Sequence, residues 1–185
     1  MDGRMMMTRR TGAGPGAPGR VGRTVRALYT PEQRLRRDAT RWTLVQGILA
    51  PIQFLVFAIS VVLVLRSLLT GDGIFPAHVS IIVKTMLLYT IMVTGAIWEK
   101  VVFGQYLFAE AFFWEDAVSF VVIALHTIYL GGLLTGRLST RALLLVALAA
   151  YTVYVINAVQ FVLKLRAARL QEARDRAQRP LAVPA

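Results

Sequence analysis

The sequence contains no cysteine and few charged residues. Both features limit the kinds of site and the class of protein that it can form. Without cysteine, its 185 residues form no disulfide, no thiolate-held iron–sulfur cluster and no cysteine nucleophile. Charged residues make up 17% of the chain, fewer than in a soluble domain. Nucleotide-binding loops, redox-cofactor motifs and zinc-protease motifs are absent, and the opening MDGRMMMTRR lacks the apolar core of a signal peptide. The predicted site instead offers carboxylates, amides, aromatic rings and one histidine.

Hydrophobic residues are abundant and fall into four long runs. They make up 56% of the chain, and the mean hydropathy is +0.58. Each run is close to the roughly 20 residues that cross a bilayer. The runs cover residues 43–65, 78–98, 117–134 and 141–163. We therefore predict an all-α integral membrane protein with four transmembrane helices in a bundle.

The ends of the chain differ from this membrane domain. Residues 1–27 are rich in Gly, Pro and Arg, which predicts a disordered basic tail. Residues 28–170 form the membrane domain, and residues 171–185 form a charged tail. Thr30–Gln33 has the pattern of a capping box with proline at the first helical position, so we expect an interfacial helix to begin there.

The positive charge sets the topology. Ten Lys or Arg residues precede the first predicted span and six follow the fourth. The positive-inside rule therefore places both termini, and the loop between the second and third spans, in the cytoplasm. This explains the net charge of +11, with membrane lipid as the partner of the basic tails and no nucleic-acid partner.

The loop predicted at residues 97–116 combines acidic and aromatic side chains. It holds four of the ten acidic residues of the chain: Glu99, Glu110, Glu115 and Asp116. It also holds seven aromatic residues: Trp98, Phe103, Tyr106, Phe108, Phe112, Phe113 and Trp114. Glu110 is equally well explained as a solvated residue. Carboxylates withdrawn from water among aromatic rings predict acid–base chemistry on a flat, apolar substrate.

Polar residues inside the spans point toward the same end of the bundle. Helical spacing places three sets on shared faces: Gln46 with Gln53; Glu115 with Ser119 and His126; Tyr154 with Asn157, Gln160 and Lys164. Hydrogen bonds between helices explain the amides as well as substrate contact does. The one-sided polarity favours a site open to the cytoplasm over a channel. Lys84 and His78 are expected at the far interface, with Lys84 extending toward it along the lipid.

Three long segments resemble the bacteriochlorophyllide 3-vinyl hydratase family, also called 2-vinyl bacteriochlorophyllide hydratase. The resemblance covers about residues 28–170 and rests on LYTPEQRLRRDATRWTLVQGILAPIQFLVF, VKTMLLYTIMVTGAIWEKVVFGQYLFAEAFFWEDAVSFVVIALHTIYL and YVINAVQFVLKLRAARL. It implies that water is added across the C3 vinyl group of a chlorophyllide-type tetrapyrrole, giving a 1-hydroxyethyl group, during bacteriochlorophyll synthesis. It also implies the inner, photosynthetic membrane of a phototrophic bacterium. Because hydration is redox-neutral, we expect no cofactor, with magnesium present only in the substrate.

The residues suggest roles in such a reaction. We expect Glu115 or Glu99 to protonate the vinyl group, and Asp116 or the partner carboxylate to activate water. We expect His126 to ligate the substrate's magnesium and Lys100 or Lys164 to pair with its propionate. The remaining predicted substrate contacts are Trp98, Trp114, Phe113, Gln46, Gln53, Asn157 and Gln160.

Simpler explanations exist for several of these residues. Trp98 and Trp114 are also explained as anchors at the membrane interface, and Lys100 as a topology charge. A non-catalytic pigment-binding or assembly protein would use the same aromatic residues and His126 without needing the carboxylates. A small transporter is a third alternative, weakened by the absence of inverted repeats.

Overall fold

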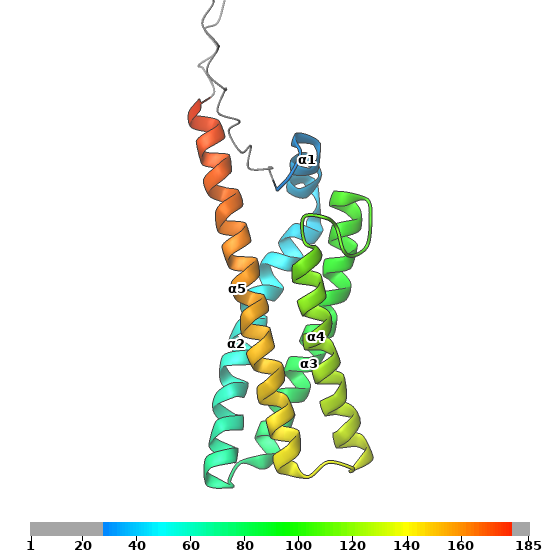
Figure 1. Ribbon diagram of the computed structural model, residues 1–185, viewed down its shortest axis with the longest axis vertical. Helices are drawn as coiled ribbons and strands as arrows, with labels where there is room; N and C mark the ends of the chain where they lie inside the picture. The colour runs from blue at the N-terminus through cyan, green and yellow to red at the C-terminus, as the bar shows by residue number, and fades with distance from the viewer. Residues whose placement is uncertain (1–27, 179–185) are drawn as a thin grey trace, which may run out of the picture.

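The computed structural model describes residues 28–178, and this part of the chain is entirely helical (Figure 1). The helices are α1 (Pro31–Ala39), α2 (Arg41–Thr70), α3 (Ile74–Phe103), α4 (Phe113–Thr135) and α5 (Thr140–Gln178). This confirms the predicted all-α class. The tail predicted at residues 1–27 and the last seven residues of the charged C-terminal tail lie outside the described residues.

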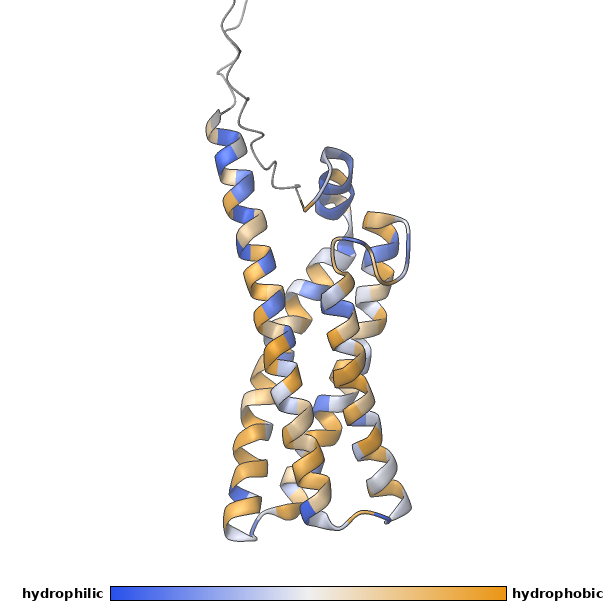
Figure 2. Ribbon diagram, viewed as in Figure 1, coloured by the Kyte–Doolittle hydropathy of each residue, from blue (hydrophilic) through white to orange (hydrophobic). Residues whose placement is uncertain are grey.

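Helices α2 to α5 are each long and apolar enough to cross a membrane, as predicted. Figure 2 shows hydrophobic residues along all four, and hydrophilic residues on α1 and on the end of α5. The 39 residues of α5 rise about 58 Å, whereas a bilayer core is about 30 Å thick. The last turns of α5 therefore project beyond the core, at the end of the bundle that also carries α1 (Figure 1).

The predicted loop boundaries were wrong. Instead of a loop over residues 97–116, α3 continues to Phe103 and α4 begins at Phe113, so only residues 104–112 connect them. Helix continues through the flanking residues because it satisfies the backbone where water is scarce. Gly104 ends α3 at a φ of 88°, and its N–H donates to the Lys100 carbonyl over 3.1 Å. We call residues 104–112 the connector.

The four long helices form two hairpins. Helix α2 packs mainly along α3 and α4 along α5, with lighter contact between the pairs. Away from the connector, the hairpins share an apolar core made of Phe57, Val64, Ala77, Ile81, Tyr129, Leu143, Leu144, Ala147 and Tyr151. This core fixes the end of the bundle that carries the short turns before α3 and α5.

Helix α1 begins with the predicted capping box. The Thr30 hydroxyl accepts from the Gln33 N–H over 3.2 Å, and the Gln33 amide oxygen accepts from the Thr30 N–H over 2.9 Å. Arg37 pairs with Glu172 on α5 at 3.1 Å and lies over the ring of Tyr29. Burial raises the pKa of Tyr29 to about 12, so this phenol is protonated at neutral pH. Helix α1 is thus fastened across the connector end of the bundle.

Candidate functional site

Two buried carboxyl groups from different hairpins meet beneath the connector. Glu99 lies one turn before the end of α3, and Asp116 lies in the first turn of α4. Their side chains interact directly, and both residues are about 95% buried, with exposures of 5% and 4%. Helix α3 brings one acid to the site and α4 the other, so the pair forms only when the hairpins pack together.

Each of these acids also holds the connector backbone. Asp116 Oδ2 accepts from the Phe108 N–H over 2.7 Å, and Glu99 Oε2 accepts from the Ala109 N–H over 3.2 Å. Phe108 has a φ of 58°, in the left-handed region that residues other than glycine seldom adopt. Its ring stacks on Phe120 of α4 at 5.4 Å. The connector is therefore shaped by the acids below it.

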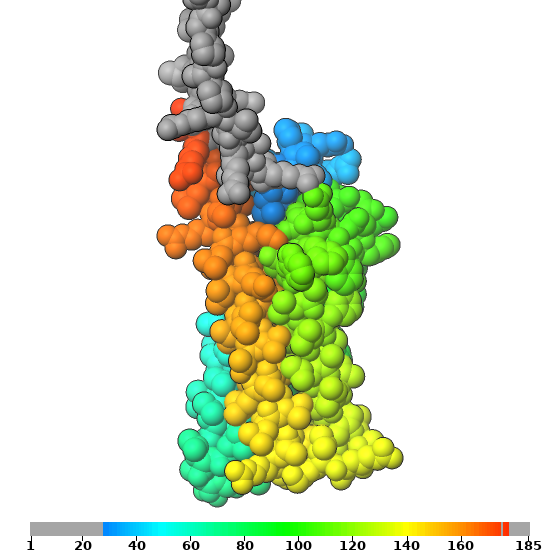
Figure 3. Space-filling view, in the orientation of Figure 1, coloured from blue at the N-terminus to red at the C-terminus, as the bar shows by residue number. Residues whose placement is uncertain are grey.

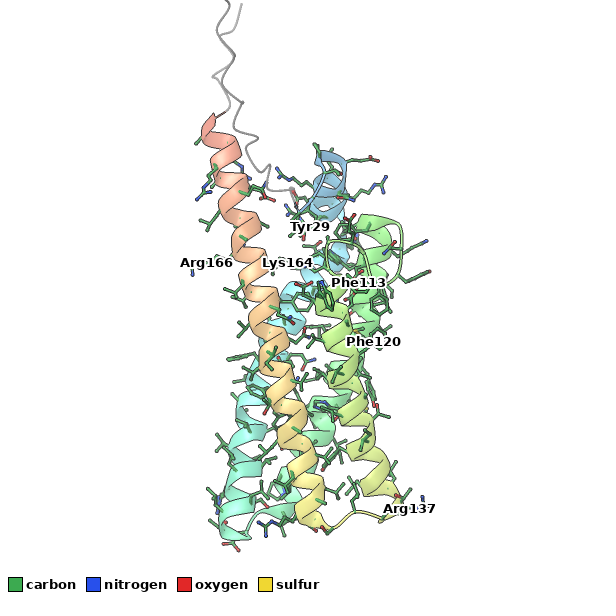
Figure 4. The ribbon with its side chains drawn as sticks, in the orientation of Figure 1. Tyr29, Phe113, Phe120, Arg137, Lys164 and Arg166 are labelled. Atoms are coloured by element: carbon green, nitrogen blue, oxygen red, sulfur yellow. The ribbon has the colours of Figure 1, made fainter. Side chains whose placement is uncertain are left out.

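Glu115 has a different partner from the other two acids. It forms an ion pair with Lys164 of α5, and Lys164 also donates to the carbonyl of Ala111. The Lys164 ammonium lies 5.0 Å from the ring centroid of Phe112. Figure 4 shows Lys164 at the level of Phe113, above Phe120. This pair ties α5 to the start of α4, beside the Glu99–Asp116 pair.

An aromatic cluster lies beside the acids. Trp98 packs edge-on against Phe112 at 5.6 Å and Phe103 at 5.8 Å, and Tyr29 stacks on Phe103 at 5.8 Å. The indole N–H of Trp98 donates to the Thr43 hydroxyl over 2.9 Å. Trp98 therefore lies inside the bundle, where it can border a ligand.

Three predicted contacts lie on the outside instead. Trp114 is 71% exposed, Phe113 packs edge-on against it, and Lys100 donates to the Gly104 carbonyl over 2.8 Å. Figure 3 shows the connector and the start of α4 bulging from the upper part of the molecule. These residues face lipid or the interface, so they are not gathered with Trp98 around one interior site.

A second polar layer lies deeper in the bundle, and it corrects the expectation for Lys84. Lys84 is fully buried (0% exposed); it donates to the Gln53 side-chain oxygen and lies 3.6 Å from the ring centroid of Tyr154. It does not reach the interface along the lipid, because α3 begins at Ile74 and Lys84 lies almost three turns inside. His78, at the edge of the span, contacts the hydroxyl of Tyr129.

The predicted polar stripe of α4 faces this layer. His126 is fully buried, and its Nδ1 lies 2.8 Å from the Val122 carbonyl oxygen, which only accepts. In the neutral ring Nδ1 is thus the donor, and Nε2, buried without a partner, is an acceptor. Asn157 Nδ2 donates to the Ser119 hydroxyl over 2.7 Å. Glu115, Ser119 and His126 share one buried face, as the spacing predicted.

Several buried polar atoms of this layer have no hydrogen-bond partner in the described chain. They are Gln53 Nε2, His126 Nε2, Asn157 Oδ1 and Gln160 Oε1. Gln46 is satisfied, because it donates to the Thr94 hydroxyl over 2.8 Å. Unsatisfied buried groups are rare in native proteins, so these atoms mark places where a ligand or water completes the structure.

Two shallow cavities border these layers. One, of about 280 Å³, lies between the start of α1 and the connector; the residues around it include Thr30, Gln33 and Glu110. The other, of about 230 Å³, is an apolar groove between α2 and α5, and Tyr154 forms part of its wall. In the described part of the chain, no three His, Asp or Glu side chains are grouped to hold a metal ion.

Comparison with known proteins identifies the family. The family described as 2-vinyl bacteriochlorophyllide hydratase (BCHF) matches residues 29–167, about three quarters of the chain. The chain belongs to this hydratase family. The match contains every predicted site residue from Gln46 to Lys164, so both polar layers lie within the hydratase region.

Two similar proteins carry the hydratase name. The 2-vinyl bacteriochlorophyllide hydratase of Rhodobacter capsulatus is 67% identical over 150 residues, covering 81% of this chain and 87% of the relative. The hydratase of the same name from Cereibacter sphaeroides is 71% identical over 146 residues, covering 78% and 90%. No solved structure matches the chain.

Sequence reasoning missed two features of this candidate site. The first is Lys84, although a charge within an apolar span is itself a signal of function. The second is the connector backbone at Phe108 and Ala109, whose N–H groups engage the acids. The residue types at these positions do not predict the second feature, because every non-proline residue carries such an N–H group.

Proposed function

We propose that this chain hydrates the C3 vinyl group of a bacteriochlorophyllide-type tetrapyrrole to a 1-hydroxyethyl group, as a step of bacteriochlorophyll synthesis. Family membership supports the reaction class. The observation that carries the mechanism is the Glu99–Asp116 pair, buried beneath the connector and contributed by both hairpins. Adjacent carboxyl groups titrate as a pair, which allows one to carry the proton while the other is charged.

In this mechanism the protonated member of the pair gives its proton to the terminal vinyl carbon and forms a C–H bond. The positive charge develops on the carbon attached to the ring, where the macrocycle delocalises it. A water molecule attacks that carbon, and the carboxylate of the pair takes a proton from the water. The product gains one hydrogen and one hydroxyl group, and the pair again carries one proton.

Glu115 is less suited to proton donation than we expected from the sequence. Lys164 forms an ion pair with the Glu115 carboxylate, so the role of Glu115 in this proposal is electrostatic. Together with Lys164, Glu115 fixes the start of α4 and hence the position of Asp116. Glu99 and Asp116 each use one oxygen to hold the connector, and the two side chains also interact with each other, so the proton of the reaction would be shared within the pair.

Interior residues would bind the pigment. The Nε2 lone pair of His126 suits an axial contact to the substrate's magnesium, because the Val122 carbonyl orients the ring. Trp98 would border the macrocycle, and Asn157 and Gln160 offer unpaired amide oxygens to water or pigment. Gln46 holds α2 against α3, while Phe113 and Trp114 lie exposed on the outer surface of α4.

We further propose that the reaction needs no redox cofactor, and that the chain lies in the inner photosynthetic membrane with both termini in the cytoplasm. The basic excess of the tails supports this orientation and attraction to anionic lipid. The absence of cysteine allows a direct test with single-cysteine variants and a membrane-impermeant thiol reagent. Ala173→Cys should be labelled from the cytoplasmic side and Ser139→Cys from the other, and the reverse pattern would disprove the orientation.

The decisive experiment is a hydration assay. Purified protein in detergent receives a 3-vinyl bacteriochlorophyllide in water enriched in heavy oxygen, without added cofactor, and mass spectrometry follows the pigment. We expect the product to gain one labelled water. Glu99→Gln should remove most turnover, whereas Asp72→Asn, an exposed acid in the turn before α3, should have no effect.

Bound but unchanged pigment would contradict the enzyme proposal. It would favour a pigment-binding or assembly protein, in which the acids serve only to hold the connector. Equal loss of turnover in Asp72→Asn and Glu99→Gln would show that the assay reports folding rather than chemistry.

A further inference from the structure

Lys84 is a buried cation without a counter-ion. No Asp or Glu within residues 28–178 forms an ion pair with it, and its contacts are the Gln53 amide oxygen and the Tyr154 ring. The other lysines are accounted for: Lys164 pairs with Glu115, and Lys100 lies exposed over the Gly104 carbonyl. A buried ammonium is costly unless it is paired, so a bound anion would stabilise the charged form of Lys84.

The surroundings of Lys84 are built to receive a carboxylate. Gln53 is 2% exposed; its oxygen faces Lys84, and its Nε2 has a free donor. An ammonium and an amide N–H side by side present two donors to the two oxygens of one carboxylate, and charge-assisted bonds of this kind are strong. On α4, His126 is also fully buried, with its Nε2 unpartnered and its ring 5.9 Å from that of Tyr151. A magnesium contact and a carboxylate contact thus lie in one layer.

An apolar groove borders this layer at Tyr154. Phe54 of α2 and Tyr154 to Leu163 of α5 line the groove of about 230 Å³, and the Tyr154 ring separates it from the Lys84 ammonium. A molecule that enters here needs a flat apolar body and an acidic arm. A neutral lipid lacks the acidic arm, and a small hydrophilic anion lacks the apolar body. A tetrapyrrole with a free propionate has both.

The distance to the acids is compatible with one bound molecule. Fifteen residues separate Lys84 from Glu99 along α3, a rise of about 22 Å. The Cα–Cβ bonds of Glu99 and Lys84 both tilt toward the start of α3, so the reach of the two side chains and of the ligand has to cover this separation. A macrocycle standing along the bundle axis can place its vinyl edge at the acids and extend its propionate arm to Lys84.

We propose that Lys84, with Gln53, binds the free propionate of the tetrapyrrole substrate and selects the acid form of the pigment over its ester. This inference rests on the proposed function. It assigns the propionate to Lys84 in place of Lys164. Lys100, at the interface, is the remaining alternative partner.

The test compares 3-vinyl bacteriochlorophyllide with its propionate methyl ester. Affinity is measured by quenching of pigment fluorescence and turnover by mass spectrometry. Wild-type protein should bind the ester about 10- to 100-fold more weakly, with kcat little changed, because one charge-assisted contact is lost. In Lys84→Met the acid should bind as weakly as the ester, so the ratio falls to about one. Lys84→Arg should keep most of the selectivity, and the exposed Arg137→Met should keep all of it.

Three outcomes would overturn the inference. They are equal wild-type affinity for acid and ester, unchanged selectivity in Lys84→Met, and loss of selectivity in Lys100→Met alone, which would move the anchor to the interface. The acid and the ester are first compared on the wild-type protein. Equal affinities there would disprove the inference even if Lys84→Met misfolded. Failure of the proposed function looks different: pigment binds with acid selectivity but is never hydrated.

Discussion

The two ends of the bundle are built differently. The end that carries the turns before α3 and α5 is closed by a continuous apolar core, in which Phe57 packs edge-on against Tyr151 at 5.4 Å. The connector end holds buried acids, an ion pair and a left-handed Phe108. Buried charge and backbone strain destabilise a fold. The comparison indicates that the apolar end stabilises the hairpin pair, which lets the connector end retain buried acids and a strained backbone.

Removing the carboxyl chemistry should have the largest effect. Asp116→Asn keeps an oxygen that can accept from the Phe108 N–H but cannot exchange a proton, so kcat should fall by about 10²–10⁴-fold. Pigment affinity should stay near that of the wild type. Asp116→Ala should lose the same activity and also about 1–3 kcal/mol of stability, since the N–H loses its acceptor. If Asn retained activity and Ala did not, Asp116 would only position the connector.

Breaking the ion pair should affect both stability and rate. Lys164→Met leaves the buried Glu115 carboxylate uncompensated and should lower the free energy of unfolding by about 1–3 kcal/mol, less than for a fully buried pair because Lys164 is partly exposed. The double variant with Glu115→Gln should recover part of this loss. Thermal unfolding in detergent measures both. Additive losses in the double variant would show that the two residues do not act as a pair.

A substitution at the apolar end should change stability without changing chemistry. A Cβ at Gly132 would lie 2.5 Å from Leu138 Cδ1, so Gly132→Val should cost about 1–3 kcal/mol through overpacking. Below its melting temperature this variant should keep the wild-type kcat. Gly131→Val is the matched control, because a Cβ at Gly131 meets no atom within 4 Å. A lower kcat in folded Gly132→Val would show that the two ends are coupled.

The smallest effect is expected where α1 meets α5. Glu172→Gln breaks a partly exposed ion pair with Arg37, and such pairs contribute about 0.2–1 kcal/mol. Activity should be almost unchanged, and high salt should reduce the difference in melting temperature between variant and wild type. A large loss of activity would mean that α1 helps to close the site.

The sequence was sufficient to predict the features that depend on residue spacing within one helix. Four apolar runs predicted four spans, the Thr30–Gln33 pattern predicted the start of α1, and the spacing of Glu115, Ser119 and His126 predicted a buried stripe. These predictions depend on neighbours within one helix, where residue spacing alone determines which side chains share a face.

Features that depend on how helices meet were not predictable. The sequence placed Glu99 and Asp116 at the same end of the bundle, but it carries no signal for their direct contact, because that contact depends on how the two hairpins dock. The burial of Lys84 required the true start of α3, since a span beginning near His78 would have left the lysine within reach of the interface. The loop boundaries failed for a related reason: aromatic and acidic residues fit a buried helix end as well as a loop.

The division into two hairpins has a consequence for biosynthesis. A ribosome delivers α2 and α3 before α4 and α5, so Glu99 leaves the ribosome with the first hairpin before Asp116 emerges with the second. The acid pair and its hold on Phe108 and Ala109 arise only when the second hairpin docks. A half-assembled chain therefore has no paired acids, and under the proposed mechanism it would be inactive until the second hairpin docks.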